Sequence, residues 1–126
     1  MRRGAEVILS ILSVLFVFSV CGPAMAKNKI LYVDSYHQGY PWSDGITEGI
    51  QEVLQGKDVE LKIIRMDTKR HTSEGFKREA ASKAKALIED FKPDVVIASD
   101  DNASKYLIMP YYRDASLPFV FCGVNW

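Results

Sequence analysis

Apolar and polar residues alternate along the chain in blocks that predict strands separated by helices. Residues 29–33 predict the first strand, with an apolar run at 30–33. The run at 95–98 is continuously apolar, which is typical of a strand covered on both faces, and 119–122 is another fully apolar strand. Residues 59–64 instead alternate between apolar and charged side chains. This alternation predicts a strand with one solvent-exposed face, and therefore a strand at the edge of the sheet.

Residues 43–55 show helical periodicity between the first two predicted strands. Ser43 is the expected N-cap, and Gly56 is well placed to end the helix. The apolar positions recur at helical spacing, at Ile46, Ile50, Val53 and Leu54.

Residues 73–91 predict the longest helix, and a shorter one follows the third strand. The longer helix ends at Lys92-Pro93-Asp94, because the residue before a proline disfavours helical geometry. Its single apolar stripe consists of Phe76, Ala80, Ala84, Leu87, Ile88 and Phe91. In the shorter helix, Asp100 or Asp101 is the expected cap, and the helix extends through Met109, where Pro110 limits or kinks it.

The element order β-α-β-α-β-α-β predicts an α/β fold with a parallel sheet, helices on its faces and right-handed crossovers. Since the alternating strand is the second one, a strand order of 2-1-3-4 fits, with strand two at the outside. Residues 27–126 amount to one domain of ordinary size.

The first 26 residues are interpreted as a secretory signal peptide rather than as part of the folded domain. Arg2 and Arg3 provide a positive start, an apolar run of about 14 residues follows, and Ala24-Met25-Ala26 supplies a cleavage site. The run is shorter than the ~20 residues that span a bilayer. A lipid anchor at Cys21 is disfavoured, because the bulky Val20 precedes it. The expected location is therefore periplasmic or extracytoplasmic.

Charge and cysteine content narrow the function further. The whole chain carries 16 basic and 16 acidic residues, and residues 27–126 carry a net charge of −1 once Arg2, Arg3 and Glu6 are excluded. This balance gives no indication of a nucleic-acid partner or a polybasic membrane patch. Only Cys122 lies outside the leader, so the domain is expected to fold without an internal disulfide.

The residues with unusual chemistry follow the carboxyl ends of the predicted strands. In an open parallel sheet, ligands bind beyond these ends, near the point where the strand order reverses. For the order 2-1-3-4 that point lies between strands one and three. The loops at 34–42 and 99–102 meet there, and residues 66–72 and 123–126 belong to the same rim.

The residue types on this rim favour binding over catalysis. Tyr36, Tyr40 and Trp42 offer flat apolar faces with a polar group, although packing of the loop onto the sheet is the alternative role for each aromatic ring. Helix N-termini expected at Ser43 and Asn102 offer backbone N–H groups to an anion. Neutral donors and acceptors are supplied by Ser35, His37, Gln38, Thr68, Ser99 and Asn102.

Other kinds of site fit the sequence less well. No H-x-x-x-H or H-x-H spacing supports a metal site, and no cofactor is expected, since neither G-x-G-x-x-G nor a P-loop is present. Cys122 lies in an apolar strand, which predicts a buried, inert thiol rather than a nucleophile paired with His37. The acidic pair Asp100-Asp101 is reminiscent of a phospho-acceptor pocket, but an exported protein does not fit cytoplasmic phosphotransfer. The residues considered as metal ligands are Asp34, His37, Asp67, His71, Asp100 and Asp101.

Four segments resemble the amino-terminal lobe of the ABC-transporter substrate-binding protein family. They are residues 34–50, DSYHQGYPWSDGITEGI; 66–70, MDTKR; 92–107, KPDVVIASDDNASKYL; and 118–126, PFVFCGVNW. The resemblance is closer still to the branch of this family that also serves as the extracytoplasmic sensor part of bacterial signalling proteins. It covers essentially all of residues 28–126.

The resemblance implies one lobe of a type I periplasmic-binding-protein fold, whose two lobes hold a solute in a hinge cleft. It also implies a non-enzymatic role and a membrane permease as partner. The contacts that it implies come from residues 35–42, from Asp67 and Thr68, from the stretch Ser99, Asp100, Asp101 and Asn102, and from Gly123 to Asn125.

Because family members continue into a second lobe, residues 27–126 are interpreted as an incomplete amino-terminal lobe, and the chain as a fragment. The favoured function is the solute-binding component of an ABC transporter, holding a small polar, aromatic or anionic solute. The alternatives are a sensor input domain and, less favoured, a small flavodoxin-like enzyme. The last lacks a G-x-S-x-G motif or a glycine-rich turn. The fragment is expected to self-associate through its last apolar strand.

Overall fold

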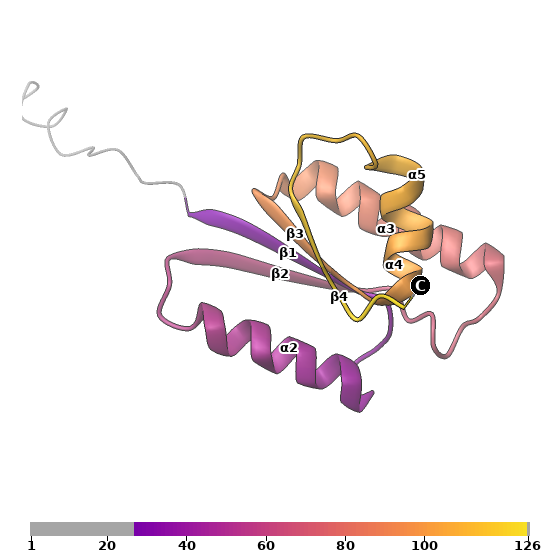
Figure 1. The fold of residues 1–126 in the computed structure, drawn as a ribbon, viewed down its shortest axis with the longest axis horizontal. Coiled ribbons are helices and arrows are strands. Elements are labelled where there is room, and N and C mark those ends of the chain that lie inside the picture. The colour runs from indigo at the N-terminus through magenta and orange to yellow at the C-terminus, as the bar shows by residue number, and fades with distance from the viewer. Residues whose placement is uncertain (1–26, 126) are drawn as a thin grey trace, which may run out of the picture.

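A computed structural model describes residues 27–125, which form one four-stranded parallel sheet (Figure 1). The strands are β1 (Asn28–Asp34), β2 (Val59–Arg65), β3 (Val95–Ser99) and β4 (Phe119–Cys122). Their spatial order is β2-β1-β3-β4, so both the predicted order and the position of β2 at an edge are confirmed. In register, Val33 of β1 lies between Ile64 of β2 and Ala98 of β3.

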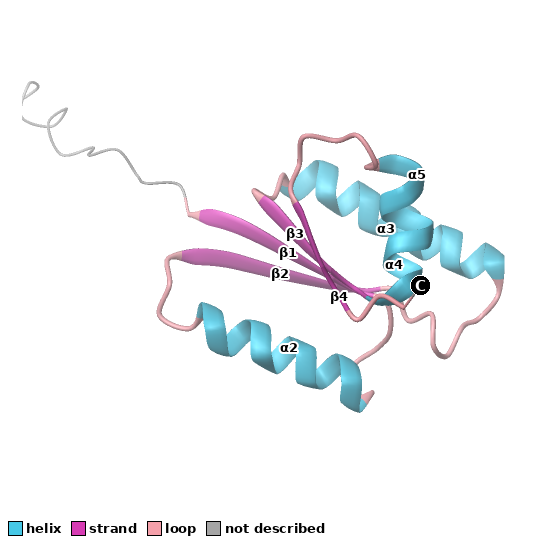
Figure 2. Cartoon of the chain, viewed as in Figure 1, coloured by secondary structure: helices cyan, strands magenta, loops and turns pink. Residues whose placement is uncertain are grey.

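Helices cover the two faces of this sheet unequally (Figure 2). Helix α2 (Pro41–Leu54) lies on one face. The opposite face carries α3 (Glu74–Phe91) and a continuous helical segment made of α4 (Asp100–Ala103), the π-helical turn η1 (Ser104–Ile108) and α5 (Met109–Tyr111). The predicted α/β architecture is therefore confirmed.

The proposed leader, residues 1–26, lies outside the described residues. Among residues 27–125, none of the helices combines the length and the apolar character needed to cross a bilayer.

Two predicted helix starts are wrong. Helix α2 begins at Pro41 with Tyr40 as its N-cap, two residues before the expected cap Ser43, because proline at the first helical turn has its φ preset and lacks the N–H that would stay unpaired. Likewise, Ser99 rather than Asp100 or Asp101 is the N-cap of α4. Ser43 and Asn102, where helix N-termini were expected, are therefore each the third residue of their helices rather than the first. The predicted N-cap Ser73 is confirmed, since its hydroxyl accepts a hydrogen bond from the Phe76 N–H.

Pro110 does not end the third helical segment, which continues to Tyr111. The turn before it is π-helical, and the Met109 N–H donates to the Ser104 carbonyl. Proline lacks an N–H and its ring crowds the preceding turn, so a widened turn just ahead of it lets the helix pass with little loss. The Tyr112 N–H then donates to the Ile108 carbonyl at 2.8 Å.

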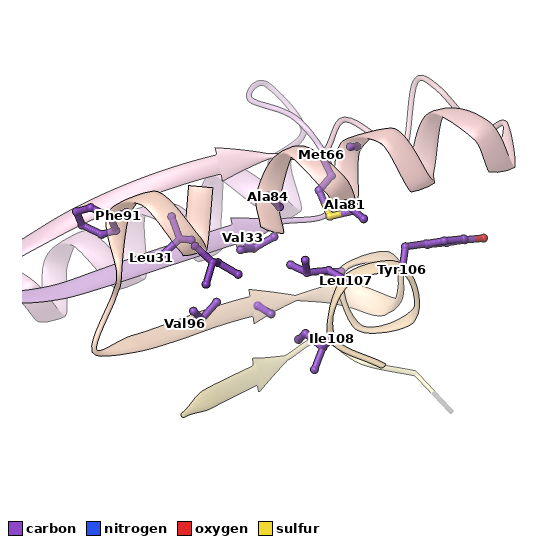
Figure 3. Close-up of a cluster of buried hydrophobic side chains, with 14 residues drawn as sticks. Leu31, Val33, Met66, Ala81, Ala84, Phe91, Val96, Tyr106, Leu107 and Ile108 are labelled. Atoms are coloured by element: carbon purple, nitrogen blue, oxygen red, sulfur yellow. The ribbon is translucent and has the colours of Figure 1, made fainter. Parts of the chain in front are cut away.

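The buried apolar cluster lies on one side of the sheet, under α3 and the α4–α5 segment (Figure 3). The strands contribute alternate residues to it: Leu31, Val33, Val96 and Ala98. Helix α3 contributes Ala80, Ala81, Ala84, Ile88 and Phe91, which confirms most of the predicted stripe. On the α2 side the apolar strand residues Ile30, Ile63 and Ile97 are only half-buried.

Candidate functional site

The loops that follow the four strands meet at one end of the sheet, as predicted. The Met66 N–H donates to the Asp34 carbonyl at 2.8 Å, and the Asp67 N–H donates to the Tyr36 carbonyl at 2.8 Å. At the other side of this end, the Asn125 N–H donates to Oδ1 of Asp101 at 2.8 Å. We call the surface formed by residues 35–42, 66–72, 99–105 and 123–125 the rim.

Three predicted contact residues build the rim from inside rather than line its surface. Ser35 is buried; its hydroxyl donates to the Ser99 carbonyl at 2.5 Å and accepts the Ala103 N–H at 2.8 Å. The Thr68 hydroxyl donates to the Ser35 carbonyl at 2.5 Å. Ser35, Thr68 and Ser99 each expose 2% or less of their surface, so their hydroxyls and carbonyls serve to join the loops.

Asn102 extends this bonded chain to the surface. Its side-chain N–H donates to the Thr68 hydroxyl at 2.8 Å, while the residue itself is only half-buried. One amide hydrogen is thereby used internally, and within residues 27–125 the amide oxygen and second hydrogen have no partner, so both can contact a ligand. The position of Asn102 is fixed through Thr68 and Ser35, so it presents these groups in a defined direction.

A buried carboxylate, Asp34, anchors the loop after β1. Its Oδ1 accepts the Ser43 hydroxyl at 2.8 Å and the Tyr36 N–H at 2.9 Å. Its Oδ2 lies 3.4 Å from Nε of Arg65 on β2, and Asp34 itself is fully buried. Asp34 therefore ties β1, β2 and α2 together beneath the rim, a role that the sequence did not reveal.

Trp42 closes the rim over the last loop. The indole Nε1–H donates to both carboxylate oxygens of Asp100, at 3.1 and 3.2 Å. Gly123, with φ +67°, lies directly against this pair, because a Cβ there would be 3.1 Å from Cζ2 of Trp42 and 3.2 Å from Oδ1 of Asp100. A side chain at position 123 would be strained at this φ and would make the indole or the carboxylate shift by a few tenths of an ångström, so the position favours glycine. Trp42 still exposes 52% of its surface.

The link between Trp42 and Asp100 leads to a pH-dependent signal. Burial raises the pKa of Asp100 above its ordinary value of 3.8. In the folded protein this carboxylate therefore takes up a proton at a higher pH than in the unfolded chain, and protonation weakens its bond with the indole. With Trp126→Phe, which leaves one tryptophan, we expect Trp42 emission to titrate with an apparent pKa above 3.8. The change should vanish in Asp100→Asn, and a signal that persists in this variant would reject the assignment.

Aromatic and charged side chains form the part of the rim between β1 and β2. The rings of Tyr36 and Tyr40 meet edge to face at 5.3 Å, and Nζ of Lys69 lies 5.0 and 5.2 Å from their centres. An ammonium over aromatic faces is an attractive cation–π arrangement. The two tyrosines are half-buried.

Asp67 gathers three basic side chains beside these rings. It adopts left-handed backbone geometry with φ +54°. Both of its carboxylate oxygens accept from Arg70 at 2.7 Å, and His37 and His71 lie 3.5 Å away. The hydrogen bond from Arg70 holds the pKa of Asp67 below its usual range. Because both of its carboxylate oxygens already accept hydrogen bonds from Arg70, Asp67 is better suited to orient the neighbouring basic side chains than to bind a solute directly.

A hollow of about 520 Å³ opens on the rim beside α4. It contains two predicted site residues, Asn102 and Asn125, together with Asp101, which the resemblance implied as a contact, and Lys105, for which the sequence had indicated no role. Charges of both signs, amides and apolar surface from Val124 and Met109 face the same space. This combination suits a small polar molecule with an apolar part.

Cys122 lies on β4. The sequence predicted a buried thiol, but the residue is only half-buried. Burial raises the pKa of its thiol, and the S–H donates to the Ala98 carbonyl at 3.8 Å. A thiol with a raised pKa carries little thiolate at neutral pH, so this environment does not activate it.

Comparison with family models, curated protein sequences and solved structures found no match for the chain.

Of the predicted site residues, the structure brings all twelve to the rim but gives them different surroundings. Tyr36, His37, Tyr40, Trp42, Asp67, Asn102, Gly123 and Asn125 are half-buried or exposed, whereas Ser35, Thr68, Ser99 and Asp100 are buried. Asp34, Ser43, Lys69 and Arg65 were missed. An acidic residue that directly follows an apolar strand was the available signal for Asp34.

Proposed function

We propose that this chain is the solute-binding component of an ABC transporter and that a small polar, aromatic or anionic solute rests on the rim. The observation that carries the proposal is the convergence of half-buried and exposed aromatic and amide side chains at the carboxyl ends of parallel strands. Tyr36, Tyr40 and Trp42 come from the loop after β1 and the start of α2, and Asn102 and Asn125 come from the segments after β3 and β4.

The expected binding mode combines stacking with directional hydrogen bonds. Trp42 and Tyr40 offer ring faces to an apolar or aromatic part of the solute. Asn102 and Asn125 can both donate and accept, while Lys69 and Lys105 provide positive charge for an anionic group. The hollow of about 520 Å³, which Asn102, Lys105 and Asn125 line, is large enough for the polar part of a metabolite-sized molecule. The aromatic rings belong to the rim outside this lining. In this proposal the loaded protein is recognised by a membrane permease.

The proposal is tested by a screen of amino acids, nucleobases and small carboxylates, with isothermal titration calorimetry as the readout. For any solute that binds, Trp42→Ala and Asn102→Ala should each weaken binding by about tenfold or more, because each removes a stacking face or a directional bond. Gln55→Ala, an exposed position at the opposite end of α2, is the matched control and should leave affinity unchanged. Equal affinity in all three variants would place the solute elsewhere.

A further inference from the structure

The two edges of the described sheet differ in their protection. Natural edge strands carry charged residues that oppose pairing with another chain. The β2 edge follows this rule with Glu60, Lys62 and Arg65. By contrast, no charged residue occurs in the seven residues Leu117–Gly123, which contain the whole of β4. Within residues 27–125, no strand pairs with the outer side of β4.

The backbone groups of β4 divide between its two sides. The Val96 N–H donates to the Pro118 carbonyl at 3.0 Å, and Val96 is in register with Phe119. In a parallel ladder the bonding residues alternate, so the N–H and C=O of Val120 face β3. The N–H and C=O groups of Phe119 and Phe121 therefore face outward, and a strand at this edge would find four backbone groups to pair with.

Apolar surface flanks this edge on both faces of the sheet. Val120 and Phe121, which point to opposite faces, expose 53% and 51% of their surfaces. On the α2 side a groove of about 390 Å³ is lined by Ile46, Ile50, Val53, Ile97, Val120 and Cys122. On the other side a hollow of about 330 Å³ lies between α5 and Phe119 and Phe121. An occupant of this edge must thus be an apolar strand whose side chains contact both faces.

We propose that this occupant is a second copy of the chain, whose β4 pairs antiparallel with β4 across a two-fold axis at Val120. In this register Phe119 lies opposite Phe121 of the second copy, and Phe121 opposite its Phe119. All outward backbone groups of both strands are then hydrogen-bonded, and the two sheets join into one of eight strands. Val120 lies opposite Val120 of the second copy as a non-hydrogen-bonded pair.

The self-complementarity of the segment favours an identical strand over an unrelated one. Val120 has a phenylalanine on each side, Phe119 and Phe121. Residues 117–123 carry no charged side chain, so the pairing brings no like charges together. The pairing also aligns phenylalanine with phenylalanine on one face and valine with valine on the other, and aromatic cross-strand pairs are favourable. A two-fold interface of this kind closes after two copies.

The first test is the mass of the purified chain in solution, measured by light scattering over a micromolar concentration series. We expect a dimer that dissociates on dilution, and a monomer in Val120→Lys, which places two like charges opposite each other. Val53→Lys is the matched control: it changes an exposed valine of the α2-side groove that lies off the edge, and it should leave the dimer intact. A monomeric wild type, or an association unaffected by Val120→Lys, would overturn the proposal.

The second test does not depend on a destabilising variant. In a Cys21→Ser, Cys122→Ser background, Val120→Cys should form a disulfide-linked dimer under mild oxidation. The Cα atoms of an antiparallel non-hydrogen-bonded pair are about 4.5 Å apart, within the range of about 4.4–6.8 Å that disulfides need. Val53→Cys in the same background should not cross-link. Equal rates for the two cysteines would rule out the proposed register, whatever the solution mass.

Discussion

Replacing Asp34 by alanine is expected to destabilise the protein by about 3–5 kcal/mol, the cost of breaking a buried charged pair and leaving its partners unsatisfied. Asp34 is fully buried and accepts hydrogen bonds from Ser43 and from the Tyr36 N–H, with Arg65 at 3.4 Å. Without the carboxylate, the half-buried guanidinium of Arg65 loses its counter-charge. The free energy of unfolding from urea denaturation measures this loss.

Two further variants separate the parts of this network. Asp34→Asn keeps an oxygen that can accept from Ser43 and Tyr36 but removes the charge opposite Arg65, so its loss should be smaller than that of Asp34→Ala. Ser43→Ala removes only one hydrogen bond and should cost about 1–2 kcal/mol. If Asp34→Ala unfolds at the same urea concentration as the wild type, Asp34 does not anchor the loop as described.

Leu107→Ala is expected to cost about 2–5 kcal/mol through loss of apolar burial and creation of a cavity. Leu107 lies on the π-helical turn, is completely buried, and points into the core cluster (Figure 3). Because its position depends on the widened turn before Pro110, this substitution also tests whether that turn packs as described.

Leu87→Ala on α3 is the matched control for Leu107→Ala. Leu87 packs against the same cluster but is only partly buried, so less area is lost and the measured destabilisation should be clearly smaller. An equal or larger loss for Leu87→Ala would contradict the burial that distinguishes the two leucines.

The strands and their order could be predicted because burial leaves a direct trace in the sequence. The charged alternation of Glu60 and Lys62 placed β2 at an edge, and the uninterrupted run at 95–98 placed β3 inside. The start of α2 was misjudged because Ser43 has the chemistry of an N-cap. Pro41, two residues earlier, fixes the backbone that starts the helix, and the Ser43 hydroxyl turns inward to Asp34 instead.

The rim was predictable in place but not in detail. Parallel topology alone brings the strand-following loops to one end, so the sequence was enough to place Tyr36, Trp42 and Asn102 there. Which serine or threonine faces outward depends on bonds between distant segments, such as Ser35 with Ala103, 68 residues apart. Single-sequence patterns carry no record of such partners, and for the same reason the roles of Asp34 and Gly123 emerged only from the structure.

The central claim is that the rim holds a solute without reacting with it. The most direct measurement is two-dimensional NMR of the isotope-labelled chain during titration with a solute found in the screen. We expect amide shifts confined to residues 35–42, 66–72, 99–105 and 123–125, and recovery of the unaltered solute afterwards. Shifts centred on the opposite end of the sheet, near residues 56–58 and 92–94, or chemical conversion of the solute, would contradict it.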